Sequence, residues 1–292
     1  DIVADGYRSD ILNSDELGAG AAVFVLGYRI GMLISGAFAL FLADHLPWAT
    51  VYKIMAPFML LGIIAVLWGE EAEPPHPRTL AEAVVHPFQL FFKKREAVLL
   101  LTLIILYKLP DAFAGAMTTP FLMDIGFAKA DIGIMNKGWG LLATILGALA
   151  GGAILSRIGL YRSLWIFGIL QGVSNLVFSG LAVSGPSTLG LFFAVGIENL
   201  SGGMGTSAFV AFLMSLTERR YSATQYALFS SLSALLSRIS GPAAGSLAEA
   251  VPWPLFYGIS TFGAIPGLFL LWKAKPSIIS ALSLREKEGG TP

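Results

Sequence analysis

Eight long apolar segments dominate this chain of 292 residues. A helix that crosses a bilayer needs about 20 mostly apolar residues, at a rise of about 1.5 Å each. Charged residues make up only 13% of the chain, against about 25% in soluble domains, and the mean hydropathy is +0.72. These features predict an all-α integral membrane protein. The segments cover residues 18–43, 50–68, 97–123, 130–156, 161–183, 187–216, 222–250 and 252–273, and residues 1–12 are expected to form the polar end of a further helix.

Composition also excludes several kinds of site. The net charge is zero, which argues against a nucleic acid partner. Without cysteine the chain has no disulfide, thiol nucleophile or cysteine-ligated metal. His45, His76 and His86 lie in loops or at segment ends, and no two share a metal-ligand spacing. We therefore expect no cofactor.

Lysine and arginine are distributed unevenly between the two sides of the predicted membrane domain. Alternate loops on one side carry thirteen of them, whereas the opposite side carries Lys129 and, at a segment edge, Lys53. Because cytoplasmic loops carry the excess of positive charge, the first side is predicted to be cytoplasmic, together with the linker and the C-terminus. The thirteen residues are Arg8, Arg78, Lys93, Lys94, Arg95, Arg157, Arg162, Arg219, Arg220, Lys273, Lys275, Arg285 and Lys287.

The longest connection, residues 69–96, divides the chain. It begins with Glu70-Glu-Ala-Glu-Pro-Pro-His-Pro77, a proline cluster typical of extended linkers. Thr79-Leu-Ala-Glu82 matches a helix capping box, and the apolar spacing after it predicts a short interfacial helix, broken or bent at Pro87.

Two segments precede this linker and six follow it, which suggests half of a six-plus-six bundle. We therefore expect residues 1–68 to be the remainder of a first helix bundle that is truncated at the N-terminus. Residues 69–96 are the cytoplasmic linker, 97–275 a six-helix bundle, and 276–292 a cytoplasmic tail. Kinks are predicted at Pro110, Pro120, Pro242 and Pro266.

Charged residues lie near the middle of several apolar segments. A charge at the bilayer centre costs at least about 2.5–3.5 kcal/mol on insertion scales, so the default interpretation of such a residue is functional. The residues are Arg29, the pair Lys108 and Asp111, Lys137, Glu198 and Arg238.

The loop between the second and third segments after the linker contains a recognisable signature. Residues Gly152-Ala-Ile-Leu-Ser-Arg-Ile-Gly-Leu-Tyr-Arg162 fit Gly-x-x-x-Asp-Arg-x-Gly-x-x-Arg at Gly152, Arg157, Gly159 and Arg162, with Ser156 in place of the acid. This pattern resembles the major facilitator superfamily, in which the loop ties neighbouring helices together and gates the inward opening. The missing acid weakens an inferred charge lock, and an ordinary positively charged turn is the alternative.

Longer strings resemble one branch of that superfamily, the AmpG muropeptide permeases, over essentially the whole chain. They are Gly18-Ala-Gly-Ala-Ala22, Leu26-Gly-Tyr-Arg29, Leu106-Tyr-Lys-Leu-Pro-Asp-Ala-Phe113, Gly140-Leu-Leu-Ala-Thr144, Phe167-Gly-Ile-Leu-Gln-Gly172, Glu198-Asn-Leu-Ser-Gly-Gly-Met-Gly-Thr-Ser-Ala-Phe-Val210 and Ser222-Ala-Thr-Gln225. The resemblance implies that residues 1–12 end helix 4, that 18–68 holds helices 5 and 6, and that 97–273 holds helices 7 to 12.

The same resemblance implies a function. It predicts proton-driven import of anhydro-muropeptides (N-acetylglucosaminyl-anhydromuramyl peptides) across the bacterial inner membrane, for peptidoglycan recycling and β-lactamase induction. The expected partners are membrane lipid, this small glycopeptide and protons, with the protein a monomer. The alternatives are a facilitator for another bulky anionic solute, such as an acyl-coenzyme A or a peptide, and more remotely an integral-membrane transferase, for which the sequence shows no paired histidines and no Gly-x-Ser-x-Gly.

In the superfamily fold, helices 1, 2, 4, 5, 7, 8, 10 and 11 line a central cavity, and this map gives the polar residues roles. The substrate and proton pathway is expected to include Lys108, Asp111, Lys137, Glu198, Asn199 and Gln225. Lys108 and Asp111 are spaced i, i+3 and could instead form a structural ion pair. Lys137 could hold substrate carboxylates, and Glu198 could carry the proton or be a fixed partner of Lys137 or Arg238.

The remaining polar residues are expected to act in gating or between helices. This group comprises Arg29 and Arg238, Asp1 and Asp5, and the loop residues Gly152, Arg157, Gly159 and Arg162. Asp1 and Asp5 are expected to anchor a helix end with Arg8 rather than to relay protons. Gln171 and Asn175 are expected to form helix–helix hydrogen bonds, and aromatic residues such as Trp139 and Phe113 to pack rather than to stack on sugars.

Overall fold

The computed structural model describes residues 2–13, 15–70, 79–94, 96–218 and 221–289, and no strand occurs in these ranges. Before the linker lie α1 (Ile2–Ile11), α2 (Leu17–Met32), the π-helix η1 (Leu33–Phe38), α3 (Ala39–Ala43), α4 (Trp48–Met55) and α5 (Phe58–Trp68). The linker helix is α6 (Leu80–Lys93). After it come α7 (Ala97–Tyr107), α8 (Leu109–Asp124), α9 (Lys129–Ile134), the π-helix η2 (Met135–Gly140), α10 (Leu141–Ile158), α11 (Leu160–Ser184), α12 (Thr188–Leu216), α13 (Ser222–Ala250), α14 (Trp253–Phe262), α15 (Ala264–Lys273) and α16 (Lys275–Gly289).

These helices match the eight apolar segments predicted from the sequence, once contiguous pieces are joined. Six of the joined helices are long and apolar enough to cross a membrane: Leu17–Ala43, Trp48–Trp68, Ala97–Asp124, Lys129–Ile158, Leu160–Ser184 and Trp253–Lys273. The helices α12 and α13, each 29 residues long, are long enough as well. They are less apolar than these six, because they carry many glycine, serine and polar residues. An all-α membrane fold is therefore confirmed, whereas the number of eight complete spans stays a prediction.

Two of the predicted proline kinks coincide with interruptions of a helix. Lys108 separates α7 from α8 with φ −93° and ψ 0°, and Pro110 occupies the first turn of α8. Gly263 separates α14 from α15, shortly before Pro266. At Pro120 and Pro242, by contrast, α8 and α13 continue without a break. The two π-helical segments were not predicted.

The helices after the linker, α7 to α15, form what we call the second bundle. For α1 to α5 we keep the name first bundle, although their membership of a separate bundle stays a prediction. Within the second bundle α12 packs on α10 and α11, α14 on α11, α15 on α7, and α13 on α8. The pairing of α10 with α12 depends on small residues, as predicted. A side chain at Gly203 would overlap the backbone at Thr144, and one at Gly151 would approach the Met204 Cα to 2.7 Å.

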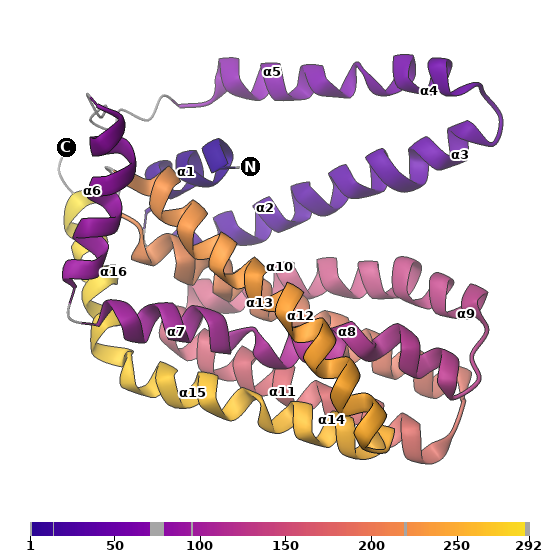
Figure 1. Ribbon diagram of the computed structural model, residues 1–292. Helices are drawn as coiled ribbons and strands as arrows, with labels where there is room; N and C mark the ends of the chain where they lie inside the picture. Colours follow the sequence, from indigo (N-terminus) through magenta and orange to yellow (C-terminus); the bar gives the residue numbers. More distant parts are fainter. Residues whose placement is uncertain (1, 14, 71–78, 95, 219–220, 290–292) are drawn as a thin grey trace.

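The two bundles meet at one end of the molecule, which carries α1, α6 and α16 and which we call the linker end (Figure 1). There a side chain at Gly18 would lie 3.0 Å from the Gly152 carbonyl oxygen, so α2 and α10 are in close contact. Farther along α2, Gly27 and Gly31 have open space where a side chain would be. Figure 1 shows α2 and its continuation diverging from the second bundle toward the opposite, far end. The close contact between α2 and the second bundle is therefore confined to the part of α2 near Gly18 and does not extend to Gly27 and Gly31.

The linker helix and the C-terminal segment differ in part from expectation. Thr79 caps α6 by accepting a hydrogen bond from the Glu82 amide at 3.1 Å, as the capping box predicted. The helix is not broken at Pro87, because it continues to Lys93. The proline cluster of the linker lies largely outside the described residues. The segment expected to be a polar tail is helical as far as Gly289.

Candidate functional site

A cavity of about 190 Å³ lies where the first bundle faces the second. Its walls come from α2, α8, α10 and α12, and we call it the central cavity. Two carboxylates, one guanidinium, one amide and two hydroxyls line it together with a glycine. These residues are Arg29, Asp111, Thr144, Glu198, Asn199, Gly202 and Thr206.

Asp111 forms an ion pair with Lys108, which was the alternative to a place on the substrate and proton pathway. The Lys108 Nζ lies 3.1 Å from the Asp111 Oδ2 and 3.4 Å from the Thr206 hydroxyl. The break between α7 and α8 at Lys108 places this side chain beside the cavity rather than in a continuous helix surface. Gln171 of α11 donates a hydrogen bond to the same Oδ2. The pair therefore belongs to a network that connects three segments of the second bundle.

Glu198 and Asn199 occupy the facing wall on α12. The Asn199 Nδ2 donates to the Val195 carbonyl at 2.9 Å and to the Glu198 Oε2 at 3.2 Å, while its Oδ1 accepts from the Thr144 hydroxyl at 3.0 Å. Among the described residues no lysine or arginine lies within 4.0 Å of the Glu198 carboxylate. The alternative of a fixed ion pair with Lys137 or Arg238 is therefore not observed.

Arg29 brings a cation from the first bundle into this cavity. Its Nε is buried and has no hydrogen-bond partner in the described part of the chain. The side chain shares the cavity with Asp111 and Glu198 without forming an ion pair with either in the described ranges. A cation that lines the same cavity as two acids without an ion pair to either can take up a partner when the cavity narrows or when an anion enters.

Several predicted site residues lie elsewhere. Lys137 is exposed on η2, and Arg238 is exposed on α13. Gln225 is buried at the linker end, where its side chain accepts from the Glu218 amide at 2.8 Å and donates to the Pro87 carbonyl at 3.4 Å. These bonds join α6 to the turn before α13, so the position of Gln225 fits a structural role better than a place on the substrate pathway.

Two acids, Asp1 and Asp5, were expected to anchor a helix end together with Arg8. Asp5 pairs with Arg8 at 2.8 Å, as predicted, and Asp1 lies outside the described residues. Arg8 itself is buried rather than exposed in a loop, with its guanidinium 3.8 Å from the centre of the Phe24 ring and 5.1 Å from that of Tyr226. This residue connects α1 to α2 and to α13.

The two glycines of the loop signature occupy positions where a larger residue would be strained or would clash. Gly159 adopts φ +83° between α10 and α11, a conformation that favours glycine. Gly152 lies where α10 touches α2. Arg157 and Arg162 are exposed and form no ion pair among the described residues, and the Ser156 hydroxyl donates to the Gly152 carbonyl. The charge lock that the superfamily signature would supply is thus not seen here.

Thr144, Gly202 and Thr206 were not predicted to line the site. Spacing could have indicated two of them, because Glu198, Gly202 and Thr206 follow each other at i, i+4 and i+8 on one face of a helix. Thr144 and Gln171 could not have been identified in this way, since they reach the site from other helices.

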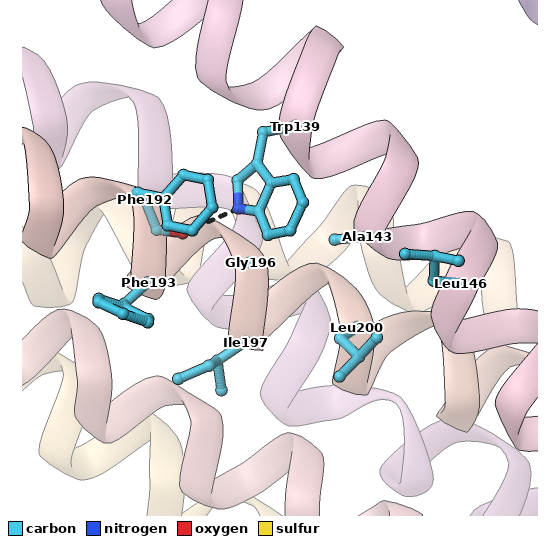
Figure 2. A pocket seen from close by; sticks show the side chains of 8 residues that line it. All are labelled: Trp139, Ala143, Leu146, Phe192, Phe193, Gly196, Ile197 and Leu200. Atoms are coloured by element: carbon cyan, nitrogen blue, oxygen red, sulfur yellow. Dashed lines mark hydrogen bonds between the residues drawn. The ribbon is translucent and has the colours of Figure 1, made fainter.

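A second pocket, of about 180 Å³, lies between α10 and α12 and is lined only by apolar and aromatic residues (Figure 2). The Trp139 ring stacks on Phe192 with a centroid separation of 4.4 Å, and its Nε1 donates to the Phe192 carbonyl at 2.9 Å. Phe113 stacks on Phe256 in a similar way, at 5.9 Å. Both aromatic residues therefore pack against other rings, as expected. Within the described ranges no group of three or more histidine or acidic side chains is arranged to hold a metal ion.

Comparison with known proteins agrees with this architecture. Residues 2–242 match the family model for the Major Facilitator Superfamily. The chain is 50% identical over 275 residues to the anhydromuropeptide permease of Escherichia coli K12, which covers 93% of this chain and 56% of that protein. It is 36% identical over 280 residues to a putative transporter AmpG 4 of Rickettsia felis, of which it covers 68%. An uncharacterized protein of Haemophilus influenzae is 38% identical over 290 residues. The chain spans little more than half the length of the Escherichia coli relative. It belongs to the major facilitator superfamily and, within it, to the AmpG group of transporters.

Proposed function

We propose that the full-length protein imports anhydro-muropeptides together with protons across the bacterial inner membrane. One observation carries this proposal: charged and polar side chains of α2, α8, α10 and α12 converge on a single cavity between two helix bundles. Transporters built from two related bundles bind substrate and coupling ion at such an interface. The name of the Escherichia coli relative supports the class of substrate.

The lining of the cavity suits a glycopeptide. A muropeptide carries sugar hydroxyls, amides and carboxylates, and the cavity offers hydroxyls from Thr144 and Thr206, the Asn199 amide and the Arg29 guanidinium. An arginine can hold a carboxylate through two parallel hydrogen bonds. We assign carboxylate binding to Arg29, with the exposed Lys137 meeting the peptide on its way in.

Glu198 is our proposed proton carrier. It lines the cavity, and its one described hydrogen-bond partner is its neighbour Asn199. A carboxyl group with so few partners can bind a proton in one conformation and transfer it in another, when Arg29 approaches or leaves. The Lys108–Asp111 pair has more described hydrogen bonds than Glu198, and we propose that it shapes the site.

The direction of transport follows from the charged loops. The loops on the side of the linker carry most of the lysine and arginine residues, and the positive-inside rule supports a cytoplasmic position for this side. In this proposed orientation the far end faces the periplasm, the side from which an imported solute would enter. The role in peptidoglycan recycling and β-lactamase induction, and the monomeric state, belong to the same proposal.

Uptake into proteoliposomes tests this function. The full-length protein should accumulate labelled anhydro-muropeptide only when a proton gradient is imposed, and unlabelled anhydro-muropeptide should compete. Absence of gradient-dependent uptake would refute the proposal. Competition by an acyl-coenzyme A or by a peptide without sugar, but not by muropeptide, would favour the alternative of another bulky anionic solute.

A further inference from the structure

A side chain of α11 contacts a residue that lines the central cavity. Gln171 lies in the middle of α11, which packs on α12 and α14 and contributes no residue to the cavity wall. Its side chain is only 2% exposed, and its Nε2 donates a hydrogen bond to the Asp111 Oδ2. We propose that Gln171 is a positioning residue that orients the Asp111 carboxylate for proton-coupled uptake. This inference rests on the function proposed above.

A glycine makes this reach possible. The Gln171 amide passes beside Gly205 of α12, and a side chain at Gly205 would overlap all three terminal atoms of the amide. The absence of a side chain at Gly205 therefore leaves room for the amide beside α12. Because α11 and α8 also pack directly on each other, the hydrogen bond adds a polar link where these two helices meet.

The hydrogen bonds to Asp111 are unevenly distributed over its two oxygens. Lys108 and Gln171 both donate to Oδ2, whereas no described residue donates to Oδ1. Lys108 supplies the opposite charge, and the neutral Gln171 amide fixes the orientation of the Asp111 carboxylate. Because two donors already occupy the lone pairs of Oδ2, this arrangement leaves Oδ1 as the oxygen that can take a proton or a substrate hydrogen bond.

The groups around Asp111 define what else could respond to pH. Lys108 faces it from the break between α7 and α8, and Thr206 faces Lys108 from α12. Glu198 of α12 and Arg29 of α2 line the same cavity. Tyr107 of α7 is buried nearby, with its hydroxyl donating to the Leu164 carbonyl at 2.9 Å.

Asn175 provides a matched control on the same helix. It lies one turn after Gln171 and is 1% exposed, and its Nδ2 has no hydrogen-bond partner in the described chain. Asn175 is thus a buried polar residue of the same helix that does not contact Asp111 through a described hydrogen bond. Replacing it tests packing of α11 without touching the cavity.

The experiment measures gradient-driven uptake of labelled anhydro-muropeptide by the full-length protein and by three variants, from acidic to alkaline pH. Gln171→Leu should reduce uptake roughly tenfold to hundredfold, the range expected for a hydrogen bond to a charged group. Asn175→Leu should stay within about twofold of the unmodified protein, because no hydrogen bond is lost. Gln171→Glu retains the shape and should be inactive at alkaline pH but recover as the pH falls, because one protonated carboxyl group restores the hydrogen bond.

The outcomes separate this inference from the proposed function. If the unmodified protein shows no gradient-dependent uptake, the function itself is refuted. If it is active but Gln171→Leu behaves like Asn175→Leu, or Gln171→Glu shows the unmodified pH profile, Gln171 does not position Asp111. Recovery of Gln171→Glu at acidic pH would also demonstrate that this variant folds.

Discussion

Glu198 and Arg29 lie on helices of different bundles, and both line the central cavity. Neither forms an ion pair among the described residues, although a buried charge gains most from a partner. We infer that this arrangement keeps both groups available.

The first prediction concerns Glu198. Glu198→Gln in the full-length protein should abolish accumulation driven by the proton gradient, because the amide cannot carry a proton. Exchange of labelled for unlabelled substrate without a gradient should persist. Both are measured in the same proteoliposomes, and survival of gradient-driven accumulation would remove Glu198 as the coupling residue.

A second prediction distinguishes Arg29 from Arg238, for which the sequence predicts the same role in gating or between helices. Arg29→Ala should weaken binding of labelled muropeptide about tenfold or more, because a charge-assisted hydrogen bond is lost. Arg238→Ala should change the affinity little, since that side chain is exposed on α13 and does not line the cavity. Equilibrium binding in detergent measures both, and equal effects would contradict the assignment.

At the scale of elements, close contact between α10 and α12 depends on glycines that are not interchangeable. A side chain at Gly203 would overlap the backbone of α10, whereas one at the adjacent Gly202 would meet nothing within 4 Å. The same substitution at neighbouring positions should therefore have opposite consequences.

Gly203→Ala should lower the free energy of unfolding by about 1–3 kcal/mol, the usual cost of overpacking. Gly202→Ala should leave stability unchanged or raise it by up to about 1 kcal/mol, because alanine favours the helix. Thermal unfolding in detergent measures both. Comparable destabilisation by the two would show that the helices do not approach as described.

The paired helices α2 and α10 also carry the two π-helical segments, at similar distances from their contact. Gly36 in η1 is eighteen residues beyond Gly18, and Ile134, next to η2, is eighteen residues before Gly152. At about 1.5 Å per residue both lie roughly 27 Å from the crossing. Segments of this type occur often at functional sites.

Closure of the far end should therefore bring Gly36 and Ile134 together. In the full-length protein freed of other cysteines, Gly36→Cys with Ile134→Cys should form a disulfide when substrate and protons cycle the transporter. The control pair, with the first cysteine at Gly62 on α5 instead, should not. Electrophoresis after mild oxidation measures both; cross-linking of the control pair alone would show that the far end closes differently.

For the whole molecule, the bundles touch at the linker end and separate at the far end. Gly6 of α1 lies so close to Ala223 of α13 that a side chain there would come within 2.7 Å of the Ala223 Cβ. In the proposed orientation, with the linker end in the cytoplasm, this contact lies on the cytoplasmic side.

Orientation is the prediction that belongs to this scale. A cysteine replacing Arg162, at the linker end, should react with an impermeant thiol reagent only after the inner membrane is permeabilised. One replacing Lys129, at the far end, should react in spheroplasts. Both side chains are exposed, so the reagent can reach them. The reverse pattern would invert the proposed topology.

Much of this protein follows from the sequence alone, because the interactions involved are local. Apolar runs of membrane length determine the helices, and Pro110 marks the break at Lys108. The Lys108–Asp111 pair follows from i, i+3 spacing, and the Thr79 cap from a four-residue pattern.

Only the tertiary structure decided which polar residues share the cavity. It brought Arg29, Asp111 and Glu198 together, left Lys137 and Arg238 exposed, and placed Gln225 in a structural contact. It also joined Gln171 to Asp111 across sixty residues of sequence. The physical reason is that the rotation and depth of each helix are set by non-local contacts such as those of Gly203 and Gly205, and no local spacing encodes which helix will face which.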